Sequence, residues 1–208
     1  MFTRVDTEKW SRRHAYAFFK NFDDPFFNIT ATVDVTACYR RCREEHSSFF
    51  LNYLYWSLRA ANEVEAFRLR LRHGDVVCYD TVHAGSTILM PDETFRFCYF
   101  DFRADLETFV REGLMLIDRE RNNPGLDARD EAYDMIHYSV IPWISFSSFK
   151  HARRWGREDS IPKIVFGKFA EQGDKLLMPV SVEVHHALMD GIHVGRYFEC
   201  FQQMLYEK

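Results

Sequence analysis

The stretch MPVSVEVHHALMDGIHVGRYFECF, residues 178–201, joins a strand pattern to a helix pattern through two adjacent histidines. Apolar and polar side chains alternate up to His186, which predicts a half-buried strand. In that strand His186 would continue the apolar face and His185 would point the other way. Asp190 and Gly191 follow where the strand turns towards a final helix. We therefore expect a buried imidazole at His186, close to an acidic side chain.

Several kinds of site are compatible with a histidine at the end of a strand. It can be a packed core residue, or a general base that takes a proton from a substrate. A metal site would draw on His185, His186, Asp190 and His193, but the strand sends the first two apart, and no HExxH helix occurs. A serine hydrolase needs a GxSxG elbow, which the sequence lacks. The spacing alone leaves the core residue and the general base open and disfavours the metal site.

The rest of the chain mixes strand and helix patterns without regular alternation. Strand patterns occur at 27–35, 67–80, 86–90, 94–102, 163–169 and 175–187, and helix patterns at 35–46, 47–64, 104–123 and 193–208. The segment 67–80 reads as a hairpin with its turn at 73–75, and the two strands after it are expected to continue the same sheet. This order predicts the α+β class, with a mixed, mostly antiparallel sheet.

The composition is that of a globular protein: of 208 residues, 47% are hydrophobic and 28% charged. The net charge of −4 excludes the basic surface typical of nucleic-acid binding. No apolar run approaches the roughly 18 residues that span a bilayer, and the charged N-terminus does not resemble a signal peptide. Five cysteines without a CxxC pair indicate reduced thiols. We expect a cytoplasmic protein with no nucleic-acid or membrane partner.

The segment HHALMDGIHVGRYFE resembles the HHxxxDGxH signature of the chloramphenicol acetyltransferase family, with its following VGR. Further family segments occur in matching order: VDTEKWSRRHAYAFF, FRLRLRHGDVVCYDTVH, DETF, SVIPWISFSSF and QGDKLLMPVSVEVHHALMDG. The resemblance covers essentially the whole chain. It implies a single chloramphenicol acetyltransferase-like domain over residues 1–208. The implied fold is that of the CoA-dependent acyltransferases, a two-layer sandwich in which the sheet packs against helices.

This resemblance also implies a reaction and its catalytic residues. The family transfers an acetyl group from acetyl-CoA to a hydroxyl of a small alcohol, without a metal and without an acyl-enzyme. By motif position His186 is the general base, and Ser139 donates a hydrogen bond to the oxyanion. Asp190 is expected to pair with Arg12 and not to orient the base directly. Family members are homotrimers, in which His186 of one subunit would face an acceptor pocket supplied largely by its neighbour.

The residues expected at the CoA channel are Trp143, Lys168 and Phe169, the last in place of a family tyrosine. The acceptor pocket is expected to contain a second set: Phe18, Phe19, Phe27, Thr87, Phe95, Arg96, Leu126 and Val165. Three of these depart from the pattern of members that bind chloramphenicol. Phe19 stands for a tyrosine, Val165 for a threonine and Arg96 for a serine. Arg96 would either bring a positive charge to the pocket, favouring an anionic acceptor, or point to solvent.

Two function classes follow from these residues. The first is an O-acetyltransferase for chloramphenicol or a related small alcohol, with antibiotic resistance as its role, or for a different and possibly anionic acceptor. The second is a homologue that binds CoA or another small ligand with little turnover. The joint presence of a base, an oxyanion donor and the Arg12–Asp190 pair favours the enzyme, because a binding protein has no chemical use for them.

Overall fold

A seven-stranded sheet forms the centre of the computed structural model, which describes residues 1–123, 125–126, 129, 132–153 and 158–207. Its strand order is β2-β10-β8-β7-β5-β6, and the short β9 pairs with β10. The elements in chain order are β1 (Phe2–Arg4), α1 (Arg13–Phe19), β2 (Phe26–Asp34), α2 (Thr36–Glu44), α3 (Phe49–Glu63), the 3₁₀ helix η1 (Glu65–Arg68), β3 (Leu69–Arg72), β4 (Asp75–Tyr79), β5 (His83–Leu89), β6 (Phe95–Phe100), α4 (Leu106–Arg121), β7 (Met135–Ile141), β8 (Lys163–Gly167), β9 (Ala170–Gln172), β10 (Lys175–His185) and α5 (Gly191–Tyr206).

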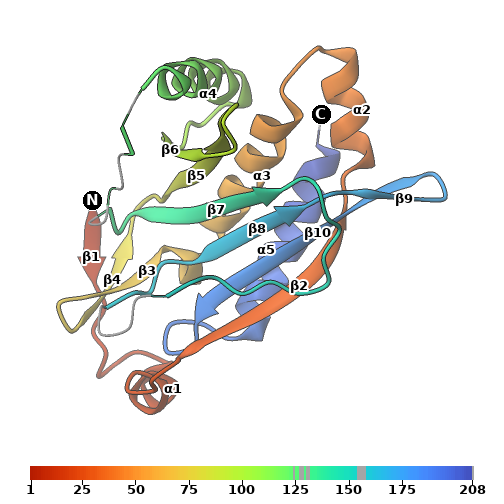
Figure 1. The fold of residues 1–208 in the computed structure, drawn as a ribbon. Helices are drawn as coiled ribbons and strands as arrows, with labels where there is room; N and C mark the ends of the chain where they lie inside the picture. The colour runs from red at the N-terminus through yellow and green to blue at the C-terminus, as the bar shows by residue number, and fades with distance from the viewer. Residues whose placement is uncertain (124, 127–128, 130–131, 154–157, 208) are drawn as a thin grey trace.

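The central sheet is mixed, as the sequence predicts. Strand β10 runs antiparallel to β2, β8 and β9, and β5 runs antiparallel to β6. Strand β7 runs parallel to both of its neighbours, β5 and β8, and these are the parallel pairings among the described strands. Helices α3 and α5 lie together against one face of the sheet (Figure 1). The expected α+β class, with a mostly antiparallel sheet and helices as a second layer, is therefore confirmed.

The hairpin forms where it is expected, but it belongs to another sheet. Its turn places His73 and Gly74 at φ values of 53° and 83°, the left-handed backbone that a two-residue hairpin turn requires and that glycine adopts without strain. Strand β4 pairs with β3 on one side and with β1 on the other, in a separate three-stranded sheet. The expectation that β5 and β6 continue the hairpin sheet is wrong. Alternation along a strand identifies its faces but not its partners, and β5 pairs with β6 and β7.

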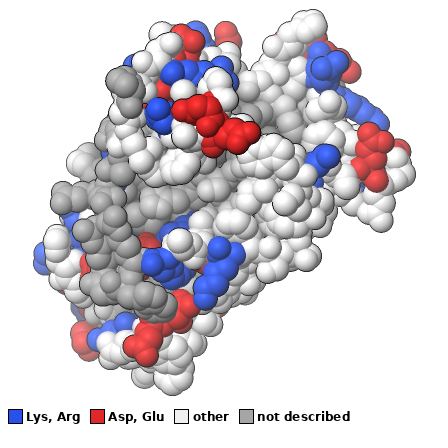
Figure 2. Space-filling model, viewed as in Figure 1, with Lys and Arg blue, Asp and Glu red and all other residues white. Residues whose placement is uncertain are grey.

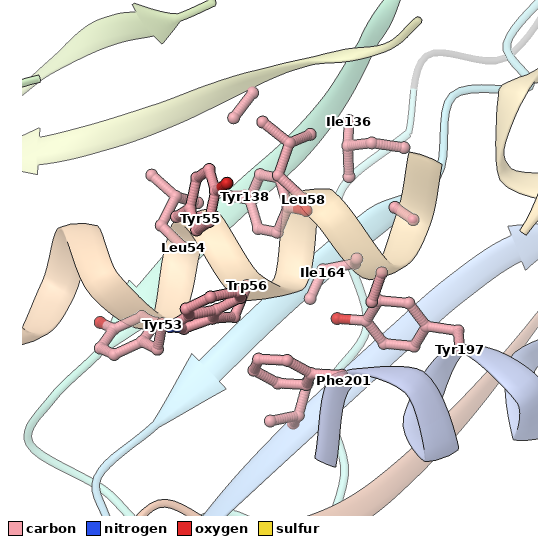
Figure 3. Packing of buried hydrophobic residues seen from close by; sticks show 14 of the residues in the cluster. Tyr53, Leu54, Tyr55, Trp56, Leu58, Ile136, Tyr138, Ile164, Tyr197 and Phe201 are labelled. Atoms are coloured by element: carbon pink, nitrogen blue, oxygen red, sulfur yellow. The ribbon is translucent and has the colours of Figure 1, made fainter. Parts of the chain in front are cut away.

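The main core lies between α3, α5 and the central sheet. The large side chains that meet there are Tyr53, Leu54, Tyr55, Trp56, Leu58, Ile136, Tyr138, Ile164, Tyr197 and Phe201 (Figure 3). Ser57 links two of these side chains: its hydroxyl donates to Tyr138 Oη at 3.2 Å and lies 2.6 Å from Tyr197 Oη. Ser48 caps α3 by accepting a hydrogen bond from the amide of Leu51. This core holds β10 rigidly up to the turn that carries His186.

The other face of the sheet, here called the outer face, is more polar. A row across it is fixed by strand register, since Ser139 pairs with Val165, Val165 with Ser181, and Ser181 with Thr30. The chain that follows β7 crosses in front of β8, β10 and β2 on this face (Figure 1). Lys and Arg atoms gather beside Asp and Glu atoms on the same face close to α1 (Figure 2).

Among the residues that the structure describes, no helix is long and apolar enough to cross a membrane.

Candidate active site

Strand β10 ends at His185, one residue earlier than the alternation predicts. His185 is only 3% exposed, and its Nδ1 accepts a hydrogen bond from the amide of Ala187 at 3.2 Å. The amide of His186 donates to the carbonyl of Pro25 at 2.7 Å, and its side chain is 33% exposed. The expectation that His186 is the buried member of the pair is therefore wrong. A turn begins at His186 and carries its ring off the apolar face to the end of the sheet.

Two aromatic rings of the same chain enclose the His186 imidazole. Phe19, at the end of α1, stacks on it with centroids 3.9 Å apart and planes inclined by 9°. Phe27, in β2, lies with its centroid 4.6 Å away. Phe18 packs on Phe19 at 4.9 Å and is itself 64% exposed. Phe19 and Phe27, both expected in the acceptor pocket, thus contact His186 of their own chain, and Phe18 packs behind Phe19.

The expected partners Arg12 and Asp190 are in contact. Nη1 and Nη2 of Arg12 donate to the two carboxylate oxygens of Asp190, the second at 2.6 Å. The same guanidinium donates to the carbonyls of His186 at 2.5 Å and Ala187 at 3.2 Å. These hydrogen bonds hold the pKa of Asp190 below its usual value. Arg12 therefore fixes both the carboxylate and the backbone of the turn that presents His186.

Asp190 also lies beside the imidazole, but it makes no hydrogen bond to the ring, so the expectation that it does not orient the base directly stays a prediction. Its Oδ1 is 3.1 Å from Nδ1 of His186, although the direction does not suit a hydrogen bond, and Nδ1 is buried without such a partner among the described residues. A carboxylate this close to the ring attracts a positive charge on it without a hydrogen bond. His193 supports the carboxylate's position by accepting the amide hydrogen of Asp190 at 3.0 Å.

Ser139 lies far from His186 within one chain. It faces Val165 and then Ser181 across the sheet, and Ser181 precedes His186 by five residues along β10. At about 3.3 Å per residue, Ser181 and His186 are separated by roughly 16 Å along the strand alone. Val165 is fully buried. Thr87 is also remote from His186, because its strand β5 is separated from β10 by β8 and β7 in the central sheet. A single chain therefore does not bring the expected base and oxyanion donor together.

Four residues expected in the acceptor pocket, Thr87, Phe95, Arg96 and Leu126, lie on or near β5 and β6, and they do not share one face. Thr87 pairs with Phe97, whereas Arg96 occupies the neighbouring register position, so their side chains leave opposite faces. The Arg96 guanidinium donates to the carbonyls of Asn123 at 3.3 Å and Phe95 at 3.0 Å. Arg96 is thus engaged away from the face of Thr87, and the idea of an anionic acceptor held by it finds no support. Phe95 and Leu126 are 47% and 56% exposed.

The residues expected at the CoA channel gather at the end of β7 and β8 that is remote from His186. Trp143 lies in the turn after β7 and is 60% exposed. The amide of exposed Lys168 donates to the carbonyl of Ile144 at 2.9 Å, which joins the two segments. Phe169 follows and packs on Tyr39, with centroids 5.2 Å apart. An aromatic face and a cation are therefore available to a ligand, while Phe169 is anchored in the core.

The sequence interpretation overlooked a charged cluster on the outer face, here called the Arg153 cluster: Asp24, Lys150, Arg153 and Glu183. Arg153 donates to Glu183, and the two side chains are only 9% and 3% exposed. Lys150 Nζ contacts Asp24 at 3.1 Å. The Cζ of Arg153 lies 3.2 Å from the ring centroid of Phe26. One signal was present in the sequence: Glu183 alternates with valines in a central strand, where a buried carboxylate needs a cation.

In the part of the chain that the structure describes, no three His, Cys, Asp or Glu side chains are grouped to hold a metal ion.

Comparisons with known proteins identify a family and a fold for this chain. A family model described as Chloramphenicol acetyltransferase matches residues 1–202. A chloramphenicol acetyltransferase of Proteus mirabilis is 28% identical over 200 residues, covering 96% of this chain and 92% of the relative. Chloramphenicol acetyltransferase 3 of Escherichia coli is 25% identical over 209 residues. A solved chloramphenicol acetyltransferase superposes with a TM-score of 0.93 at 30% identity, covering 99% of this chain and 100% of that one. A probable dihydrolipoamide acetyltransferase of Listeria monocytogenes shares the fold, at a TM-score of 0.66 and 12% identity.

Proposed function

Since the chain belongs to the chloramphenicol acetyltransferase family, a family of acyltransferases, we propose that it moves an acetyl group from acetyl-CoA to a hydroxyl of chloramphenicol or a related small alcohol. One observation carries the proposal: a partly exposed imidazole stands at the end of a rigid strand, with a carboxylate 3.1 Å from its Nδ1. The partly exposed ring of Phe19 stacks on it, and the exposed ring of Phe18 packs on Phe19. That arrangement suits a base that must meet an incoming alcohol.

In the proposed reaction His186 acts through Nε2. It takes the proton of the acceptor hydroxyl while that oxygen attacks the thioester carbonyl of acetyl-CoA. The new carbon–oxygen bond forms, the carbon–sulfur bond then breaks, and the proton on the imidazole passes to the departing thiolate. A positioned base of this kind contributes about 10²- to 10⁴-fold in rate. Asp190 stabilises the transient imidazolium, and Arg12 keeps that carboxylate ionised and in place.

The tetrahedral intermediate needs a donor where its negative charge develops, and Ser139 is proposed for that role. Because Ser139 and His186 are far apart in one chain, the donor facing a given His186 is proposed to come from a second copy. We therefore place each site between subunits of a homotrimer. In that arrangement Phe18, Phe19 and Phe27 come with His186, whereas a neighbour adds the remaining acceptor residues, Thr87, Phe95, Leu126 and Val165. Arg96 is not among them.

Acetyl-CoA is proposed to approach along the end of β7 and β8. The exposed Trp143 ring suits stacking on the adenine, and the Lys168 ammonium suits the phosphates. Phe169 would act indirectly: its packing on Tyr39 would fix the segment that carries Lys168. These residues fit a nucleotide-bearing thioester, which supplies the acyl group and a thiolate that leaves readily.

We also propose that residues 1–208 form one domain and that the protein works in the cytoplasm. The domain proposal is supported by the family match over residues 1–202. The proposed location is supported by the five cysteines, all of which are free thiols.

A thiol-release assay tests the proposed activity. The protein is incubated with acetyl-CoA and chloramphenicol, and free CoA is measured against a control without acceptor. We expect acceptor-dependent release and an acetylated product by mass spectrometry. Release at the background rate with chloramphenicol and with a panel of small alcohols would contradict acetyl transfer. If calorimetry still showed acetyl-CoA binding, the chain would be a binding homologue instead.

A further inference from the structure

We propose that the acceptor of this protein carries several hydroxyl groups, as a neutral polyol or glycoside does, and that a cavity next to His186 binds one of them between Asp24 and Arg153. This inference rests on the proposed acetyl transfer and names the acceptor class of the same site. The cavity has a volume of about 390 Å³, which lies within the range of small-ligand sites.

The cavity adjoins the candidate base through shared residues. Phe27 lines it and also contacts the His186 ring, with centroids 4.6 Å apart. The carbonyl of Pro25, between the cavity residues Asp24 and Phe26, accepts the amide hydrogen of His186 at 2.7 Å. The segment 24–27 therefore borders the cavity and also positions the imidazole.

Charge in the cavity is balanced by pairing. Its charged lining residues are the four members of the Arg153 cluster, two cations and two carboxylates. Arg153 pairs with Glu183, and Lys150 pairs with Asp24. A ligand with a net charge would be repelled by the side chains of the same charge in this cluster. It would also leave one of the two ion pairs with an unbalanced charge. A neutral ligand avoids that cost.

Two polar atoms in this cluster lack hydrogen bonds. Oδ1 of Asp24 and Nε of Arg153 are both buried without a hydrogen-bond partner among the residues that the structure describes. They lie 3.7 Å apart, too far for a direct hydrogen bond. Buried polar atoms are nearly always paired, so an unpaired donor beside an unpaired acceptor indicates a group that joins them.

The two atoms have opposite requirements, and this defines the joining group. Nε–H of Arg153 needs an acceptor, whereas Oδ1 of Asp24 needs a donor. An ammonium group cannot accept from Arg153, and a carboxylate cannot donate to Asp24. A hydroxyl does both. A small separation of the two side chains would admit it from the cavity, and a water molecule is the competing occupant.

The remaining lining suits the rest of such a ligand. The rings of Phe26 and Phe149 offer apolar faces, and Thr30 and Ser148 add hydroxyls. Aromatic faces with interleaved polar groups match a molecule that has apolar C–H surfaces and several hydroxyls. With one hydroxyl held at Asp24 and Arg153, a second is the one that gives its proton to His186 and receives the acetyl group from the thioester.

The test compares two acceptors that share a six-membered ring but differ in hydroxyl number, methyl β-D-glucopyranoside and cyclohexanol. With acetyl-CoA and the wild-type protein, we expect kcat/KM for the glucoside to exceed that for cyclohexanol at least tenfold. Asp24→Ala should lower the value for the glucoside by about 10- to 150-fold, the loss associated with a hydrogen bond to a charged group. Asp23→Ala removes the neighbouring exposed carboxylate, which does not line the cavity, and should preserve the preference.

Two results would overturn the inference: equal kcat/KM for the two acceptors in the wild type, or a preference that Asp24→Ala leaves unchanged. Either result would assign a water molecule to the Asp24–Arg153 pair. Chloramphenicol is assayed in parallel. Thiol release with chloramphenicol but not with the glucoside would contradict the proposed acceptor class and leave the proposed acetyl transfer intact. If no acceptor released thiol, the proposed function would fail, and the cavity would still be tested by calorimetric binding of the glucoside to wild-type and Asp24→Ala protein. Undetectable binding to the wild type would overturn the inference there too.

Discussion

His185 and His186 are adjacent in sequence but have different environments. The first is packed at the end of β10 with its Nδ1 hydrogen-bonded to the backbone, and the second is partly exposed between two phenyl rings. Position in the chain does not distinguish them, since both follow the same run of valines. The difference arises because the strand ends between them, so that the turn directs only His186 to the surface.

Substitution of the two histidines should separate catalysis from packing. We expect His186→Ala to lower kcat by about 10²-fold or more, because the base is lost, with little change in folding. His185→Asn keeps an acceptor for the amide of Ala187 and should retain most of the activity. Steady-state thiol release measures the activity of both variants, and circular dichroism checks that both are folded like the wild type. Equal losses in two folded variants would contradict His186 as the base.

The buried His185 should make the protein less stable in mild acid. Burial lowers its pKa from 6.5 to about 4, so the folded protein keeps this ring neutral while the unfolded chain protonates it below pH 6.5. The unfolding free energy should therefore fall between pH 6.5 and 4, by roughly 3 kcal/mol for this group. His151, whose pKa burial also lowers to about 4, acts in the same direction.

Urea titrations at pH 7.5, 6 and 5 would measure this slope. His185→Asn should flatten it, whereas His73→Asn, at an exposed hairpin turn, should leave it unchanged. An identical slope in wild type and His185→Asn would show that the acid sensitivity lies elsewhere.

Residue identity at the site was more predictable than side-chain environment. The contact of Arg12 with Asp190 follows from the family motif, and the structure contains it. The exposure of His186 does not follow, because it depends on where a strand ends, and one residue reverses the face. The direction of Arg96 was also open in the sequence. Its register opposite β5 decides it, and a register needs a partner strand that the local pattern does not identify.

At the scale of elements, one ion pair joins the start of the first helix to the start of the last. Arg12 immediately precedes α1, and Asp190 immediately precedes α5. The guanidinium side chain is 10% exposed and the carboxylate 40%. Full burial of a pair makes the loss of one partner cost about 3–5 kcal/mol, and the exposure of Asp190 reduces that figure.

We expect Asp190→Asn and Arg12→Ala each to lower stability by about 1–3 kcal/mol and to reduce acetyl transfer. Their double mutant should lose less than the sum, because the same interaction is removed twice. The lowered pKa of Asp190 adds a pH effect. The pair's contribution is complete above the usual carboxyl value of 3.8 and is lost as the pH falls through the lowered folded value. Additive losses in a double-mutant cycle would contradict the coupling.

Most elements were predictable from local pattern, and their assembly was not. The helix expected at 47–64 is α3, and the hairpin turn lies at His73 and Gly74 as expected. The division into two sheets was missed because β4 and β5 are close in sequence yet pair with strands of different sheets. The Arg153 cluster was missed for a related reason. Asp24, Lys150 and Glu183 lie in three separate segments, and only the folded chain brings them together.

At the scale of the whole molecule, the proposal that each active site takes His186 from one subunit and Ser139 from another can be tested directly. Protein with His186→Ala keeps Ser139, and protein with Ser139→Ala keeps His186. Each variant alone should be nearly inactive. Co-expressed, they form mixed trimers in which some interfaces contain both intact residues, and activity should return to a measurable fraction of wild type. Sedimentation should show trimers in every sample. Mixed trimers that stay as inactive as the single variants would place both residues in one subunit's site.

The pairing of β2 with β10 has a consequence for how the protein is made. Phe26 to Asp34 align with Leu177 to His185, and among the described strands β2 pairs with no other. A ribosome adds about 5–20 residues per second, so on the order of 10 s pass between the synthesis of β2 and the synthesis of its partner β10. During that interval β2 has two unpaired edges, and its backbone groups can template contacts with another nascent chain. Folding should therefore be slow and non-local, and the yield of native protein should improve when translation is slowed or chaperones shield the growing chain.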